Sequence, residues 1–117
     1  MSDDPPVLDP EIVASLRQLQ LIGRLYAAFV QGLPAHLASI RAARATGDRR
    51  GLQAVAHRLR GSSGQLGASA LSRVLGVIED AVGGDADGQP WPSDAEIEAL
   101  AQATAAAMAR ELAASSS

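Results

Sequence analysis

Apolar residues recur three or four positions apart along most of the chain, which is the spacing of amphipathic helices. A first, short segment of this kind follows Asp9 and Pro10, residue types that suit the N-cap and first turn of a helix. A much longer segment begins after residues 19–21, and its apolar positions are Ile22, Leu25, Tyr26, Phe29, Leu33, Leu37 and Ile40. The pattern therefore predicts a short helix followed by a long one.

The long helix contains Pro34, which removes a backbone hydrogen bond to the Val30 carbonyl. This predicts a kink in one helix, with two separate helices as the alternative. Gly47 suits a left-handed residue just beyond the helix, and Asp48 suits the N-cap of the next one. We therefore expect a tight, antiparallel connection at this point.

Three further amphipathic helices follow. The third is predicted from about Asp48 to Leu66, and its buried side consists of Leu52, Val55, Ala56, Leu59, Ser63, Leu66 and Ala70. Residues 67–69 predict a break before the fourth helix, whose apolar positions are Leu71, Val74, Leu75, Ile78, Ala81 and Val82. The segment 83–92 is rich in Gly, Asp and Pro and predicts the one long loop. Ser93 and Glu96 then form a capping-box pattern ahead of the last helix.

These elements predict an all-α fold, an antiparallel up-down-up-down four-helix bundle with a short additional N-terminal helix. The length of 117 residues fits one domain, which we expect at residues 9–114. Residues 1–8 are predicted to be a disordered leader, and residues 115–117 a disordered tail. Hydrophobic residues make up 47% of the chain, and alanine and leucine dominate them, which favours close-packed helices over sheets.

The net charge and the amino-acid composition exclude several classes of function. The net charge is −3 and there is no sustained basic run, which argues against nucleic acid as the main ligand. The sequence has no cysteine, which excludes disulfides and thiolate metal sites. The first residues are acidic and proline-rich, unlike a signal peptide, and the apolar runs are too short to span a membrane. We therefore expect a cytoplasmic, free-standing monomer, with a domain cut from a larger kinase as the alternative.

The third predicted helix carries one histidine opposite its apolar side. On a helix, His57 has Gln53, Arg60, Gly61 and Gly64 as neighbours on the outward face. An interior helical glycine costs about 1 kcal/mol relative to alanine. The chain has 24 alanines, so two glycines here indicate the close approach of another backbone, a bend or a helix end.

The run from Ala56 to Ala68, Ala-His-Arg-Leu-Arg-Gly-Ser-Ser-Gly-Gln-Leu-Gly-Ala, resembles the signature of histidine-containing phosphotransfer (HPt) domains, commonly A-H-x-L-K-G-S-S-x-x-L-G-A. One position departs from it, because Arg60 replaces the usual lysine. The resemblance extends over about residues 8–112. It implies the four-helix bundle and a phosphorelay, in which His57 accepts a phosphoryl group from a receiver-domain aspartate, typically of a hybrid sensor histidine kinase. His57 then passes the group to the aspartate of a response regulator.

The resemblance also implies how the chemistry is divided between the partners. The protein would be a phosphocarrier without a cofactor or ATP site, and Mg²⁺ would belong to the receiver. His57 would be the nucleophile, because a neutral imidazole has one free lone pair. The Arg60 guanidinium would stabilise the phosphoryl charge. Candidate partner-binding residues around His57 are Gln53, Arg58, Gly61, Gly64 and Gln65.

Other interpretations remain for the same residues. A non-phosphorylated binding module could use this face to grip and inhibit a receiver or kinase domain. Ser62 and Ser63 are interpreted as residues that pack and hydrogen-bond to the backbone rather than as nucleophiles, and His36 as structural or incidental. No carboxylate at ligand spacing accompanies either histidine, so we predict no metal site. The glycines of residues 61–67 follow no strand and precede no Gly-Lys-Ser/Thr, which excludes a nucleotide phosphate loop.

Overall fold

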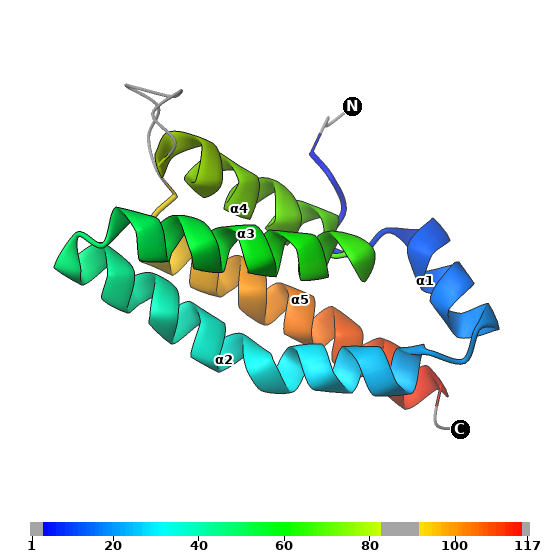
Figure 1. Cartoon of the computed structure of the whole chain (residues 1–117). Helices are drawn as coiled ribbons and strands as arrows, with labels where there is room; N and C mark the ends of the chain where they lie inside the picture. The colour runs from blue at the N-terminus through cyan, green and yellow to red at the C-terminus, as the bar shows by residue number, and fades with distance from the viewer. Residues whose placement is uncertain (1–3, 83–91, 116–117) are drawn as a thin grey trace.

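The computed structural model describes residues 4–82 and 92–115, and these ranges contain five helices and no strand. The helices are α1 (Pro10–Gln18), α2 (Ile22–Thr46), α3 (Arg49–Gln65), α4 (Ser69–Val82) and α5 (Asp94–Ser115), as Figure 1 shows. The prediction of an all-helical protein is confirmed. Most of the predicted loop, residues 83–91, lies outside the described residues.

The helix ends follow the cap residues of the sequence. The Asp9 carboxylate accepts a hydrogen bond from the Glu11 N–H at 2.9 Å and caps α1. Gly47 has a φ of 70° and ends α2, and the Asp48 carboxylate accepts from the Gly51 N–H at 2.9 Å to begin α3. Before α5, the Ser93 hydroxyl and the Glu96 carboxylate accept from each other's backbone N–H groups at 3.0 and 3.4 Å. The predicted caps and capping box are therefore confirmed.

Pro34 lies within α2, which continues without interruption from Ile22 to Thr46. The alternative of two separate helices is therefore wrong. Pro34 itself is exposed, so the residue that lacks a backbone N–H is not one of the core residues of α2.

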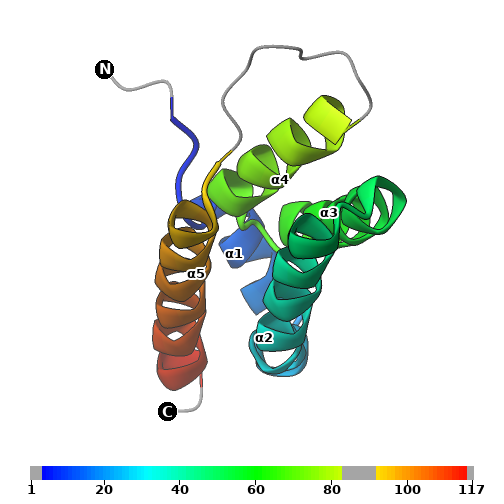
Figure 2. The ribbon, with the colours of Figure 1, turned by 90° about the vertical axis from the view of Figure 1, so that its left-hand side faces the viewer.

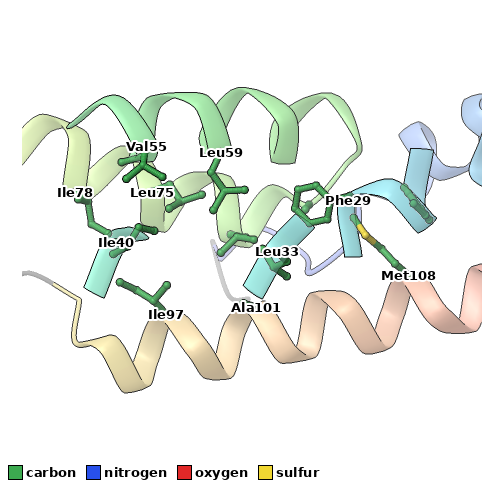
Figure 3. Close-up of a cluster of buried hydrophobic side chains, with 14 of the residues drawn as sticks. Phe29, Leu33, Ile40, Val55, Leu59, Leu75, Ile78, Ile97, Ala101 and Met108 are labelled. Carbon is green, nitrogen blue, oxygen red and sulfur yellow. The ribbon is translucent and has the colours of Figure 1, made fainter. Parts of the chain in front are cut away.

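The helices pack around one hydrophobic core. α3 packs against α2 and α4, α2 also packs against α5, and α1 contacts the beginning of α2 at one end of the molecule (Figures 1 and 2). Figure 3 shows side chains from α2, α3, α4 and α5 meeting in this core. Its largest fully buried members include Tyr26, Ile22, Ile40, Leu59, Leu71, Leu75, Ile78, Ile97 and Met108. Burial of one side of α3 in this core leaves the opposite side open to solvent.

The corner after α3 joins three parts of the chain. Gly67 has a φ of 84° there, and its carbonyl accepts a hydrogen bond from the Asp9 N–H at 2.7 Å. The buried Tyr26 hydroxyl of α2 donates to the neighbouring Leu66 carbonyl at 2.9 Å. The Ala70 N–H donates to the Pro6 carbonyl at 3.0 Å, so the described residues just before α1 lie against this corner. The domain boundaries at residues 9 and 114 stay a prediction.

Ser63 offers a test of the packing of α3. Its side chain is fully buried, and its hydroxyl has no hydrogen-bond partner among the described residues. An unsatisfied buried polar group costs about 1–3 kcal/mol. We therefore expect Ser63→Ala to raise the free energy of unfolding by about 1 kcal/mol, measured by urea denaturation.

The neighbouring Ser62 provides the matched control. It is exposed, and its hydroxyl donates to the Arg58 carbonyl at 3.3 Å. Ser62→Ala gains helix propensity but relieves no buried polar group, so it should stabilise less than Ser63→Ala. A Ser63→Ala variant less stable than the parent would contradict this account of the core.

Candidate functional site

His57 lies on the outward side of α3. Its ring is held there because Ala56 and Leu59, on the opposite side of the helix, are buried in the core. The side chain of His57 is 72% exposed to solvent. The sequence-based prediction of an exposed histidine opposite the apolar side of this helix is confirmed.

The nearest polar partner of His57 comes from another helix. Nδ1 of His57 lies 2.9 Å from Oε1 of Glu79, a residue of α4. The other oxygen of the same carboxylate, Oε2, accepts a longer hydrogen bond of 3.5 Å from Nη1 of Arg60. The side chain of Glu79 is only 18% exposed. One partly buried carboxylate therefore contacts both His57 and Arg60, the two residues for which the sequence predicted a chemical role.

The state of Glu79 decides which nitrogen of His57 carries a proton. The hydrogen bond with His57 lowers the pKa of Glu79 below its ordinary value; partial burial opposes this effect, while the charges of His57 and Arg60 support it. Glu79 is therefore ionised at neutral pH and only accepts hydrogen bonds. Nδ1 of His57 must be the donor, so in the neutral ring the free lone pair is on Nε2.

Arg60 reaches Glu79 by crossing the backbone of α4 at Gly76. A Cβ atom on Gly76 would lie 3.3 Å from both Cζ and Nε of Arg60. The Arg60 carbonyl also accepts a hydrogen bond of 3.2 Å from the Ser72 hydroxyl of α4. Gly76 thus provides the space in which the guanidinium lies beside the neighbouring helix.

The two glycines near His57 differ in their surroundings. A Cβ atom on Gly61 would meet no atom within 4 Å, and Gly61 is exposed. Gly64 is half-buried, and its Cβ would lie 3.4 Å from the Ser72 hydroxyl oxygen of α4. Gly61 therefore leaves the surface beside His57 free of a side chain. At Gly64, the close approach of α4 explains why the residue is small.

The remaining predicted partner-binding residues do not form one cluster. Gln53 and Arg58 are exposed on α3, near His57 in the sequence. Gln65 lines a groove between α2 and α3, together with His36 and Phe29. Gly64 lines a second groove, between α3 and α4, with Arg60 and Gly76. The structure thus places Gln65 and Gly64 in two different grooves, one on each side of α3.

Glu79 and Gly76 were absent from the sequence-based set of site residues. A signal for Glu79 exists in the sequence: it directly follows Ile78, at the edge of the apolar side of α4. An acidic residue at such an edge faces a neighbouring helix, and α3 carries four arginines and no acid. Which residue of α3 Glu79 would contact could not be predicted without knowing how α3 and α4 align.

Within residues 4–82 and 92–115, no three histidine, aspartate or glutamate side chains gather closely enough to hold a metal ion. No helix in these ranges combines the length and apolar character that crossing a membrane requires.

The lowered pKa of Glu79 predicts a pH dependence of stability. A carboxyl whose pKa is depressed by folding stabilises the folded state above its unfolded pKa, and this contribution is lost as the pH falls through the folded pKa. The stability difference between the parent and Glu79→Gln should therefore be present near pH 7 and shrink below about pH 4. Chemical denaturation of both proteins across this range measures it, and a difference that grew as the pH fell below about 4 would contradict this account.

Comparisons with known proteins agree with the geometry. The sequence profile of the Hpt domain family matches residues 24–114. Among solved structures, the chain is similar to histidine-containing phosphotransfer protein B (HptB) from Pseudomonas aeruginosa PAO1, with a TM-score of 0.82, 25% identity, and coverage of 92% of this chain and 95% of that one. No curated protein sequence gives a significant match. The family profile covers most of the chain, which therefore belongs to the Hpt domain family and is a histidine phosphotransfer protein, a phosphocarrier of phosphorelays.

Proposed function

We propose that His57 is the residue that carries the phosphoryl group. The observation that supports this most directly is the 2.9 Å contact between Nδ1 and Glu79 on a ring that is 72% exposed. The contact occupies one nitrogen and leaves the lone pair of the other for reaction with a partner. His57 is also the histidine of the run from Ala56 to Ala68 that resembles the family signature.

The transfer step follows from this arrangement. Nε2 of His57 attacks the phosphorus of a receiver aspartyl phosphate, and the P–N bond forms as the P–O bond breaks. The aspartate leaves as a carboxylate with the electron pair of that bond. Arg60, one helical turn from His57, supplies positive charge for the phosphoryl oxygens. The Mg²⁺ ion of the reaction belongs to the receiver. The reverse sequence then passes the group to the aspartate of a response regulator.

The proposed partners dock on the face around His57. They are response-regulator receiver domains and a hybrid sensor histidine kinase, and the residues proposed to contact them are Gln53, Arg58, Gly61, Gly64 and Gln65. The exposure of Gln53, Arg58 and Gly61 supports this assignment. Gly64 and Gln65 would contact the partner from the two grooves that flank α3.

The proposed arrangement of the protein is that of a cytoplasmic monomer. Its helices α2 to α5 would form an antiparallel up-down-up-down four-helix bundle, with α1 as the short additional helix. The alternating direction of the four long helices in Figure 1 supports the bundle. The small number of exposed large hydrophobic side chains supports a monomer, since Leu19 alone of the large hydrophobic residues described is strongly exposed.

Phosphate transfer from a receiver tests the function and the residue together. The parent protein, incubated with a phosphorylated receiver domain, should acquire phosphate that is labile in acid and stable in base, as expected for phosphohistidine. His57→Gln should acquire none, because the amide has no nucleophilic lone pair at that position. His36→Gln is the matched control and should be labelled like the parent.

The outcomes separate the proposed function from its rival. Label on His57→Gln would place the phosphoryl group on another residue. Receiver binding without label on the parent, across several receivers, would instead favour a non-phosphorylated binding module.

Gly61 tests the docking face without disturbing the fold. Since a Cβ atom at Gly61 has open space around it, Gly61→Leu should fold and gain up to about 1 kcal/mol of helix stability. The new side chain would project beside His57 and obstruct the receiver, so we expect receiver affinity to fall about tenfold or more. Isothermal calorimetry and denaturation measure the two effects, and unchanged affinity would remove Gly61 from the docking face.

A further inference from the structure

The carboxylate of Glu79 is placed to influence the phosphoryl group after it reaches His57. Its two oxygens contact Nδ1 of His57 at 2.9 Å and Nη1 of Arg60 at 3.5 Å. Both contacts are formed before any phosphoryl group is present. A phosphoryl group on Nε2 would bring roughly two negative charges to the same ring and to the same arginine.

We propose that Glu79 keeps the phosphoryl group on His57 labile, by retaining the proton on Nδ1 and by competing with the phosphoryl group for Arg60. The inference rests on the proposed function of His57. It makes Glu79 a positioning residue, since the carboxylate acts through His57 and Arg60 and forms no bond to phosphorus.

The proton on Nδ1 controls how easily the P–N bond breaks. When water attacks phosphorus, the P–O bond forms, the P–N bond breaks, and Nε2 takes the electron pair. If Nδ1 carries a proton, the ring leaves as neutral imidazole; without that proton it must leave as an imidazolate anion, a much poorer leaving group. The ionised Glu79 accepts the Nδ1 hydrogen bond and so favours the protonated, labile form.

Arg60 controls how well the phosphoryl charge is stabilised. In the structure the guanidinium of Arg60 lies over Gly76 and donates a hydrogen bond to Glu79. The carboxylate of Glu79 would therefore compete with the phosphoryl group for this arginine. A carboxylate that shares this arginine reduces the stabilisation available to the phosphoryl oxygens. The negative charge of Glu79 also repels the phosphoryl group directly. All three effects shorten the lifetime of phosphohistidine.

Glu79→Gln removes the charge while keeping the shape and an acceptor oxygen. We expect the first-order loss of phosphate from His57 to slow by about threefold or more in this variant, a change of the size that one partly exposed charge pair produces. Asp80→Asn is the matched control, because it removes the same charge one residue further along α4 at an exposed position. Its phosphohistidine should have the lifetime of the parent.

Two further readouts separate the proposed role from a merely structural one. The ¹⁵N shifts of the His57 ring should show a proton held on Nδ1 in the unphosphorylated parent and a mixture of tautomers in Glu79→Gln. In an Arg60→Ala background, Glu79→Gln should lengthen the lifetime less than it does in the parent, because the competition for Arg60 is absent.

The result that would overturn the inference is a lifetime in Glu79→Gln equal to that in Asp80→Asn, or shorter. This outcome requires a parent protein labelled on His57, so it leaves the proposed function intact. A parent protein that takes no label from any receiver would instead refute the proposed function and this inference together.

Discussion

The packing of α3 against α4 is the contact on which the site depends. His57 and Arg60 lie on α3, but the carboxylate that contacts both lies on α4. The two helices approach closely because Gly64 faces Ser72 and because Gly76 leaves space for Arg60. The core holds the register between them, since Leu59 on one helix and Leu75 and Ile78 on the other are fully buried (Figure 3). A shift of one residue in either helix would separate Glu79 from His57. The packing of the buried sides of α3 and α4 therefore determines the contact between Glu79 and His57 on their outer sides.

The charge on each face of the protein also depends on how the helices pack. From residue 12 to residue 78 the sequence has nine arginines and a single acid, Asp48, although the net charge of the protein is −3. Arg41 and Arg44 of α2 pair with Glu98 and Asp94 of α5, which neutralises that side of the molecule. On α3, Arg50 and Arg58 are exposed, and neither belongs to an ion pair among the residues that the structure describes. The face around His57 is therefore more basic than the whole protein, which favours an acidic partner surface.

Much of the fold could be predicted because its signals are local. The caps at Asp9 and Asp48, the left-handed Gly47 and the apolar side of α3 depend on residues within a few positions of one another. The exposure of His57 follows from the same periodicity. Glu79 and Gly76 could not be placed in the site in this way, because their role depends on how two helices align. The choice between one helix and two at Pro34 also needed the structure, since propensity alone permits either.

Arg60 stands where the family signature usually has lysine, and this difference is linked to the residues of α4 that surround it. A guanidinium is longer and broader than an ammonium group, and it presents several donors in a fixed plane. It can therefore contact Glu79 and still lie against α4 at Gly76, where a Cβ atom would lie only 3.3 Å from the guanidinium and would oblige it to shift. A lysine would need less space and would place one compact charge near His57. We infer that Arg60 and Gly76 are coupled, so that the effect of replacing Arg60 by lysine depends on which residue stands at position 76.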